Sequence, residues 1–194
     1  NLLDSLRFAS HPRAHGTVIV FGGKVIAGTR AKKEFSKSYN AFSSINYPDI
    51  AVIHDDRIVF YIDDKEQSTK RLRFYHAMDD RIFLLKLIPS IDPLVLENLA
   101  DSYDGLILES FGVGGLPDYG NHDFAAMIEK WTSAGKLVTM STQVTHEGSD
   151  MGIYKVGKVI KENFEILESY DMTLEATVTK MMWILAQTRD FEEC

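Results

Sequence analysis

Between residues 81 and 185, apolar runs of strand length alternate with stretches of helical pattern. The runs cover residues 81–88, 105–108 and 137–140, and each is apolar almost throughout. Strands that are apolar on both faces belong in a parallel sheet covered by helices, because a half-solvated antiparallel sheet would show alternating polarity. The alternation of strands and helices indicates the same architecture. The sequence therefore predicts an α/β fold, with a small parallel sheet and helices on both faces.

Helix signals mark the segments between these strands. Helices are expected over residues 94–103, 124–134 and 153–162, with a short strand over residues 164–167. Asp92 and Pro93 suit the start of the first helix, and Gly135 suits the end of the second. A last helix from residue 171 would bury residues at helical spacing, namely Leu174, Val178, Met181, Met182 and Leu185.

The first 70 residues follow a different pattern, that of two β-hairpins. Paired β-rich runs lie at residues 17–21 with 24–27 and at residues 51–54 with 58–62. Gly22 and Gly23 join the first pair, since glycine readily takes the positive φ of a tight hairpin turn. Isolated hairpins are marginally stable. We therefore expect these hairpins to be the edge of a sheet whose other strands come from a missing part of the protein or from another chain.

The remaining segments before residue 78 complete this division. Residues 1–10 are predicted to be the end of a helix, with an apolar face that includes Leu2, Leu3, Leu6 and Phe8. Residues 29–49 are polar and basic and are expected to form an ordered loop. The charged stretch 63–71 is the linker candidate. We accordingly expect residues 1–70 to be the end of an N-terminal domain plus the linker, and residues 71–194 to be a C-terminal α/β domain.

Composition limits the classes of partner. A net charge of −7 argues against a nucleic-acid partner, because binding to phosphates needs a basic surface. The chain lacks an apolar run of the roughly 20 residues that cross a bilayer, so no membrane partner is expected. The single cysteine, Cys194, allows no intramolecular disulfide. Together these features favour a cytoplasmic location.

Polar residues follow two neighbouring strands of the predicted sheet. A glycine cluster at residues 112–115 follows one strand, and Thr142, Gln143, Glu147 and Asp150 follow the next. The carboxyl ends of adjacent parallel strands meet at one edge, where α/β folds commonly bind ligands. We expect a shared polar crevice there. Glu147 and Asp150 would engage an ammonium group, and Thr142 or Gln143 would hydrogen-bond a carboxylate.

No recognisable catalytic set accompanies this crevice in the sequence. The six histidines show no paired spacing typical of a metal site. The glycine cluster lacks the G-x-G-x-x-G spacing of a dinucleotide-phosphate site. Ser110 is not set in a G-x-S-x-G turn, and only His122 lies near it in sequence. The residues alone thus predict a ligand-binding crevice with no catalytic residue, no metal and no cofactor.

Several blocks of sequence resemble bacterial L-asparaginases of the cytosolic type, and they occur in the order of that family. The blocks are Val20-Phe-Gly-Gly-Lys24, Asn40-Ala-Phe-Ser-Ser-Ile-Asn46 with Pro48, Glu109-Ser-Phe-Gly-Val-Gly-Gly115, Thr139-Met-Ser-Thr-Gln143 and Asp171-Met-Thr-Leu-Glu-Ala-Thr-Val-Thr-Lys180. The last block is the most specific. The resemblance runs over nearly the whole chain.

This resemblance implies a two-domain enzyme, a homo-oligomer (dimer or tetramer), that hydrolyses L-asparagine, or glutamine, to the acid and ammonia. In that family the nucleophile is a threonine in an N-terminal Gly-Gly-Thr turn, assisted by a Thr-Asp…Lys group. Neither motif occurs in this sequence. By resemblance, the chain is a C-terminal fragment that helps to complete the active site and the oligomer interface. It would contain no catalytic residue and would be inactive alone.

The resemblance also implies which residues meet the substrate. Family members place an asparagine after Gly-x-Gly and, in periplasmic members, a glutamate in a later loop, both of which hold the substrate's amino group. Gly115 stands at the asparagine position, and Glu147 lies one residue from the glutamate position. Val144 replaces the cysteine that some cytosolic members use for allosteric asparagine binding. The substrate-binding candidates are therefore Gly114, Gly115, Thr142, Gln143 and Glu147.

Two other interpretations stay open at this stage. The crevice could belong to a module that binds an amino acid and regulates a larger protein without hydrolysis. The chain could also be part of the asparaginase-like subunit of a tRNA-dependent amidotransferase, whose C-terminal half resembles this one. The acidic balance of the chain disfavours direct contact with tRNA.

Overall fold

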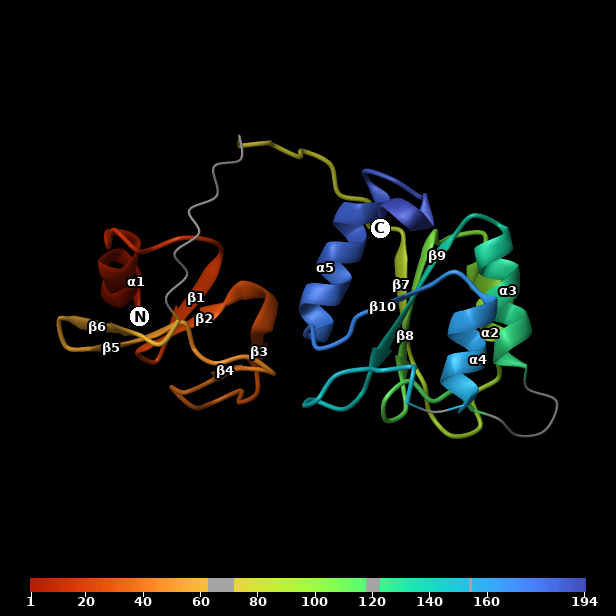
Figure 1. Ribbon diagram of the computed structural model, residues 1–194, viewed down its shortest axis with the longest axis horizontal. Coiled ribbons are helices and arrows are strands. Elements are labelled where there is room, and N and C mark those ends of the chain that lie inside the picture. The colour runs from red at the N-terminus through yellow and green to blue at the C-terminus, as the bar shows by residue number, and fades with distance from the viewer. Residues whose placement is uncertain (63–71, 118–122, 154) are drawn as a thin grey trace. The chain divides into compact units, whose positions relative to one another are not determined.

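The computed structural model describes residues 1–62, 72–117, 123–153 and 155–194 (Figure 1). Backbone contacts divide the chain into two compact units, Asn1–Phe74 and Tyr75–Cys194. The linker predicted at residues 63–71 lies outside the described residues. The crevice predicted from the sequence belongs to the second unit.

A parallel sheet of four strands forms the centre of the second unit. In space the strands follow the order β10 (Ile166–Glu168), β9 (Leu137–Thr142), β8 (Gly105–Ser110) and β7 (Ile82–Lys86). Leu84 of β7 pairs with Ile107 of β8, which in turn pairs with Thr139 of β9. Every residue of β8 is buried, which explains its apolar run. The predicted parallel sheet is confirmed.

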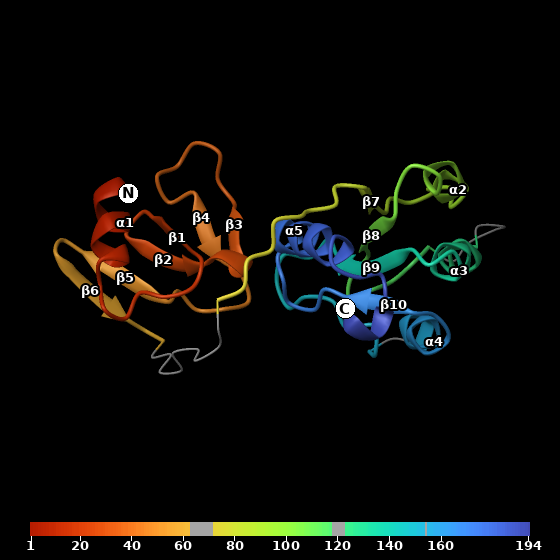
Figure 2. The same ribbon diagram turned by 90° about the horizontal axis from the view of Figure 1, so that it is seen from above.

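Helices cover both faces of this sheet, as predicted (Figure 2). The helices α2 (Val95–Leu99), α3 (Phe124–Ser133) and α4 (Lys155–Asn163) lie on one face, and α5 (Leu174–Leu185) lies on the other. Trp131 of α3 packs in the hydrophobic core on the first of these faces. Its indole N–H donates to the carbonyl oxygen of Leu96 at 3.0 Å. Met181 and Leu185 of α5 pack against Ile107 on the opposite face.

Three of these helices begin later than the sequence suggests, and α4 does so at Lys155 rather than at residue 153. Helix α2 begins at Val95, although Asp92 still accepts a hydrogen bond from the Leu94 N–H at 2.9 Å. Helix α5 begins at Leu174 rather than at residue 171, because Thr173 caps it. A threonine in extended conformation is a favoured N-cap, so the helix starts directly after it.

The buried face of α5 also differs from the predicted one. Ile184 is buried together with Met181 and Leu185, whereas Met182 is only partly buried. Successive residues are about 100° apart around a helix, so Met182 turns away from the direction in which Met181 points. Ile184 lies three residues after Met181 and therefore returns to the same face.

The first unit contains an antiparallel sheet with the order β1 (Val18–Phe21), β2 (Lys24–Ala27), β5 (Ala51–His54) and β6 (Arg57–Phe60). Both predicted hairpins are confirmed, and Gly22 and Gly23 take φ values of +59° and +75° in the first turn. The expectation that the hairpins lack a partner within the chain is wrong. Strand β2 pairs with β5 through Val25 and Ala51, so the two hairpins support each other.

Helix α1 (Leu2–Ala9) covers part of this sheet through one residue. Phe8 is buried and packs with Val25, Ala51 and Ile53. The other apolar residues of its predicted face are exposed, namely Leu2, Leu3 and Leu6. Within the described residues, the apolar face of α1 is therefore smaller than the sequence pattern indicates.

Residues 29–49, expected to form a loop, contain two short strands. Strands β3 (Ala31–Lys33) and β4 (Phe42–Ser44) form an antiparallel pair in which Lys32 lies opposite Ser43. A 3-10 turn, η1 (Gly28–Arg30), precedes β3, and another, η2 (Phe191–Glu193), ends the second unit. Neither strand shows an apolar run, so hydrophobic periodicity could not reveal them.

Candidate functional site

Three loops meet at the carboxyl edge of the parallel sheet. They are the glycine loop (residues 111–117), the β9 loop (residues 143–153) and the β10 loop (residues 169–173). The Asp150 N–H donates to the carbonyl oxygen of Val113 at 2.8 Å, which joins the first two loops. The Ser149 N–H donates to the carbonyl oxygen of Tyr170 at 2.9 Å, which joins the second and third. The loops therefore form one connected surface.

The glycine loop folds back on itself directly after β8. Phe111 and Gly115 exchange two backbone hydrogen bonds of 3.1 and 2.7 Å. Gly112 and Gly114 have φ values of +51° and +134°, which residues with a side chain seldom adopt. A Cβ atom on Gly114 would also lie 3.0 Å from Cγ of Met151. Position 114 thus requires glycine both for its backbone angle and for lack of space.

Thr142 fastens the glycine loop to the β9 loop. Its hydroxyl donates to the carbonyl oxygen of Gly112 and accepts from the Val144 N–H at 3.0 Å. Thr142 also lies opposite Ser110 in the sheet, so it sits at the point where both loops begin. The expectation that loops after adjacent parallel strands lie together agrees with this geometry.

Gln143 connects the ends of two other strands. Its side-chain nitrogen donates to the carbonyl oxygens of Leu87 at 2.6 Å and of Glu109 at 3.0 Å. Leu87 directly follows β7, and Glu109 lies near the end of β8. The amide group therefore closes the edge of the sheet between these strands, beside the contacts that Thr142 makes.

Glu147 and Gly148 form a sharp bend in the β9 loop. Their φ values are +75° and +76°. Glu147 is exposed, whereas Gly148 is buried against the β10 loop. A Cβ atom on Gly148 would overlap the carbonyl oxygen of Tyr170 and would lie 2.8 Å from Cα of Asp171. Sequence reasoning missed Gly148, for which a lone glycine in a polar loop was the sole signal.

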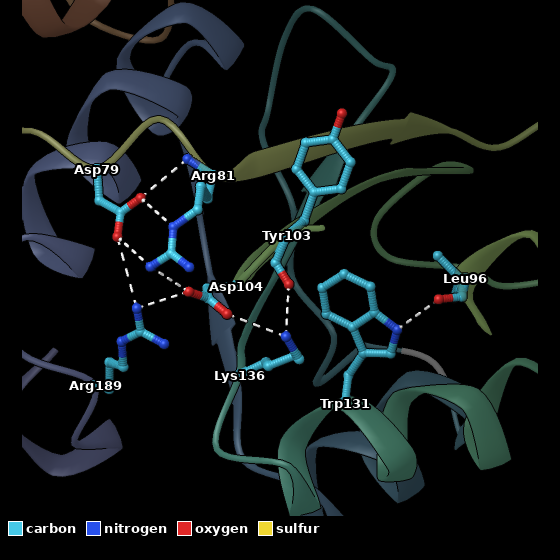
Figure 3. A network of polar contacts seen from close by, with 8 residues as sticks. All are labelled: Asp79, Arg81, Leu96, Tyr103, Asp104, Trp131, Lys136 and Arg189. Carbon is cyan, nitrogen blue, oxygen red and sulfur yellow. Dashed lines mark hydrogen bonds and ion pairs between the residues drawn. The ribbon is translucent and has the colours of Figure 1, made fainter. Parts of the chain in front are cut away.

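Charged side chains gather at the opposite, amino-terminal edge of the sheet (Figure 3). Asp104 precedes β8 and accepts hydrogen bonds from Arg189 at 2.7 Å and from Lys136 at 3.1 Å. These two cations hold the pKa of Asp104 below its ordinary value. Arg81 does the same for the pKa of Asp79 through a pair at 3.0 Å. This cluster ties the starts of three strands to the segment after α5, so we interpret it as structural.

The first unit has a cavity of its own, with a volume of about 340 Å³. Its described lining includes apolar side chains and three larger polar ones, namely Val18, Ile50, Ile62, His15, Arg30 and Tyr47. The guanidinium of Arg30 lies 5.6 Å from the centre of the Tyr47 ring. All of these residues belong to the first unit, so the cavity is separate from the three loops.

Comparison with known proteins identifies the family. A model described as "Glutaminase/Asparaginase C-terminal domain" matches residues 81–194. The chain belongs to the asparaginase family. A second model, "Asparaginase, N-terminal", matches residues 1–66. The family inferred from the sequence blocks is therefore confirmed, and both of its domain types are represented.

Relatives of this asparaginase-family chain are longer than the chain itself. An L-asparaginase from Thermococcus kodakarensis is 37% identical over 193 residues, which are 100% of this chain and 57% of that protein. The structure of the thermostable L-asparaginase from that organism matches with a TM-score of 0.90, at 36% identity and with 57% of that chain covered. L-asparaginase I from Vibrio cholerae matches with a TM-score of 0.86 at 25% identity, with all of this chain and 58% of that chain covered.

A second kind of relative carries a different name. One subunit of the glutamyl-tRNA(Gln) amidotransferase of Methanosphaera stadtmanae is 27% identical over 203 residues, which cover 100% of this chain and 45% of that protein. The asparaginase-family chain thus spans about half the length of the curated relatives it matches. Proteins with two different enzyme names thus match the same stretch of this chain.

The described residues offer neither a membrane-spanning helix nor a metal-binding cluster. None of their helices is apolar and long enough to pass through a bilayer, and α5 has 12 residues where roughly 20 are needed. Among those same residues, no group of three or more His, Cys, Asp or Glu side chains could bind a metal ion.

Proposed function

We propose that this chain is the C-terminal portion of an L-asparaginase, which hydrolyses L-asparagine to L-aspartate and ammonia. The observation that carries the proposal is the match of both asparaginase domain models, in order, together with 37% identity to an L-asparaginase over the whole chain. Hydrolysis adds water across the side-chain amide and breaks its C–N bond. The connected loops at the carboxyl edge support a binding role for this portion of the enzyme.

The proposed substrate contacts follow from the geometry of the loops. Glu147 is exposed on the β9 loop and carries the charge that an α-ammonium group requires. Gly114 and Gly115 form a close-packed wall without side chains, since a Cβ on either residue would press on Met151 or on Phe111, so a substrate would meet the backbone of this wall. Thr142 and Gln143 hold the ends of the strands, so their role would be to keep that wall in place beside Glu147.

The chain contributes no nucleophile in this proposal. The Gly-Gly-Thr and Gly-Thr-Asp motifs that carry the chemistry in L-asparaginases are not in the sequence. We assign residues 1–70 to the end of the catalytic N-terminal domain plus the linker, and residues 71–194 to the C-terminal domain. A homo-oligomer (dimer or tetramer) in the cytoplasm, with asparagine as substrate and glutamine as a second amide, completes the proposal.

Ammonia release and ligand binding by the 194-residue chain test the proposal together. We expect no ammonia from asparagine, and we expect amide chemical shifts of residues 112–115 and 142–150 to move on titration with asparagine or aspartate. Succinamate, which is asparagine without its ammonium group, should move them less, because it offers Glu147 no charge partner. Ammonia release would contradict the absence of a nucleophile. Unmoved shifts at millimolar ligand would contradict the binding role.

A second candidate is the asparaginase-like subunit of an amidotransferase that acts on glutamyl-tRNA(Gln). The observation that favours it is the match over the whole chain to the Methanosphaera stadtmanae amidotransferase. Its identity of 27% is lower than the 37% to the L-asparaginase. Retention of this chain on immobilised tRNA, reversed by salt, would favour the amidotransferase; passage without retention favours the asparaginase.

A further inference from the structure

An ion pair between a buried carboxylate and an exposed lysine lies next to the loops of the carboxyl edge. Glu168 ends β10, and its side chain is only 1% exposed. Its carboxylate accepts from the ammonium group of Lys161 at 2.7 Å, and that hydrogen bond raises the pKa of the lysine. A buried carboxylate is unfavourable unless a charge and hydrogen bonds compensate it. The burial of Glu168 therefore depends on its polar partners and is not explained by packing alone.

The second partner of Glu168 is in the β9 loop. Its other carboxylate oxygen accepts from the backbone N–H of Met151 at 2.7 Å. Met151 is 1% exposed, and helix α4 confines it as well, since a Cβ atom on Gly157 would lie 2.7 Å from the Met151 carbonyl oxygen. Both the carboxylate and the helix therefore fix the backbone of Met151.

The side chain of Met151 reaches the glycine loop. Its Cγ atom would lie 3.0 Å from a Cβ on Gly114, so methionine and glycine backbone are already in contact. The preceding residue, Asp150, donates its N–H to the carbonyl oxygen of Val113 at 2.8 Å. A shift of Met151 would therefore move two contacts that shape the glycine loop.

Lys161 also reaches the β10 loop. Its ammonium nitrogen lies 3.4 Å from the hydroxyl of Tyr170 and 5.3 Å from the centre of that ring. The carbonyl oxygen of Tyr170 accepts from the Ser149 N–H. One lysine thus contacts the two residues, Glu168 and Tyr170, that hold successive parts of the β9 loop.

We propose that Glu168 is a positioning residue of this site: held by Lys161, its carboxylate fixes Met151 beneath Gly114 and so sets the shape of the glycine loop. Its effect on substrate rests on the proposed function, whereas its effect on the loop does not. Glu168 touches neither Gly114 nor Gly115, and it acts through Met151. The Glu168–Lys161 pair lies at the carboxyl edge and shares no residue with the charged cluster at the amino-terminal edge.

Amide hydrogen exchange on the 194-residue chain tests this positioning role. Glu168→Ala removes both interactions, and we expect exchange at Gly114, Gly115 and Asp150 to become about tenfold faster, as loss of a hydrogen bond to a charged group implies. Glu168→Gln keeps an acceptor for Met151 and should restore these rates to within about threefold of the wild type. Exchange at Ile107 and Thr139 in the central strands should stay unchanged.

Glu162→Ala is the matched control, because Glu162 is also a glutamate paired with a lysine of α4, Lys158, but on the exposed surface at 3.8 Å. It should leave the three reporter amides unchanged. Three results would overturn the proposal: unchanged reporters in Glu168→Ala, equal acceleration in the central strands, or the same effect from Glu162→Ala.

Asparagine titration of the same proteins separates this inference from the proposed function. If Glu168 positions the binding wall, Glu168→Ala should weaken asparagine binding and Glu168→Gln should restore it. A wild-type chain that binds no asparagine would refute the proposed function and leave the exchange result to stand. A wild-type chain that binds, with Glu168→Ala binding equally well, would refute the positioning role alone.

Discussion

At the scale of single residues, the carboxyl edge of the sheet is shaped by how closely its backbone segments approach. Gly114 touches Met151, and Gly148 touches the carbonyl oxygen of Tyr170. Both have positive φ, so each position excludes a side chain by angle and by space. Gly112 has positive φ as well, yet among the residues that the structure describes nothing lies within 4 Å of where its Cβ would be. Gly112 is therefore favoured for its backbone angle alone, whereas Gly114 and Gly148 are required both for the angle and for lack of space.

This difference between the glycines predicts different losses of stability for two alanine variants. Gly112→Ala meets only the backbone penalty and should lower the free energy of unfolding by about 1 kcal/mol. Gly148→Ala adds an overlap with the Tyr170 backbone and should lower it by about 3 kcal/mol. Urea unfolding at equilibrium measures both values. Equal losses in the two variants would mean that the β9 and β10 loops can move apart freely.

At the scale of elements, the sequence determines strands more clearly than their pairing. The apolar runs correctly predicted β7, β8 and β9. Both faces of β8 and almost all of β9 are buried, whereas β7, at the edge of the sheet, is only partly buried. The pairing of β2 with β5 was missed, since the pattern within a hairpin does not show which strand a distant hairpin will meet. Strands β3 and β4 were missed because they lack an apolar run.

The same limit applies to the candidate site. The glycine loop and Thr142 could be placed from their positions after strands, and the structure brings them into contact. Gly148 and Glu168 could not be placed, because their importance depends on atoms from other loops. Glycine and glutamate in a polar stretch are common, and only the tertiary contacts distinguish these two.

Helix α5 offers a prediction about a cap. Thr173 is buried and accepts from the Ala176 N–H at 3.3 Å, whereas Thr179 on the same helix is exposed and donates to the carbonyl oxygens of preceding residues. Thr173→Val keeps the β-branched shape but leaves that N–H without its acceptor, so it should lower the free energy of unfolding by about 1 kcal/mol. Thr179→Val should change it by less than about 0.5 kcal/mol. Thermal unfolding compares them, and similar values would argue against a capping role for Thr173.

At the scale of the whole molecule, the second unit separates two kinds of polar residue. The amino-terminal edge of its sheet holds paired charges, with Asp104 between Arg189 and Lys136 (Figure 3). The carboxyl edge holds glycines, hydroxyls, the exposed carboxylate of Glu147 and the Lys161–Glu168 pair, which holds a loop rather than the start of a strand. Ion pairs at the amino-terminal edge fasten the starts of the strands, whereas the polar contacts at the carboxyl edge position its loops.

The charged edge predicts how stability depends on pH. Arg189 and Lys136 lower the pKa of Asp104 from its ordinary 3.8, so the folded protein binds this proton less readily than the unfolded one. Their contribution is therefore complete above the unfolded pKa and disappears as pH falls through the folded pKa. Between about pH 5 and pH 2, the wild type should lose more free energy of unfolding than Asp104→Asn, and the two should converge at the acid end.

Denaturant unfolding at a series of pH values provides the measurement, and Asp101→Asn provides the control. Asp101 is exposed and close in sequence, so its variant should follow the wild-type curve. Asp79 shares Arg81 and Arg189 with Asp104, so part of the acid loss should remain in Asp104→Asn. Parallel curves for the wild type and Asp104→Asn would show that the cluster gains nothing from its charge. In that case packing around β8, rather than ion pairing, would hold the amino-terminal edge together.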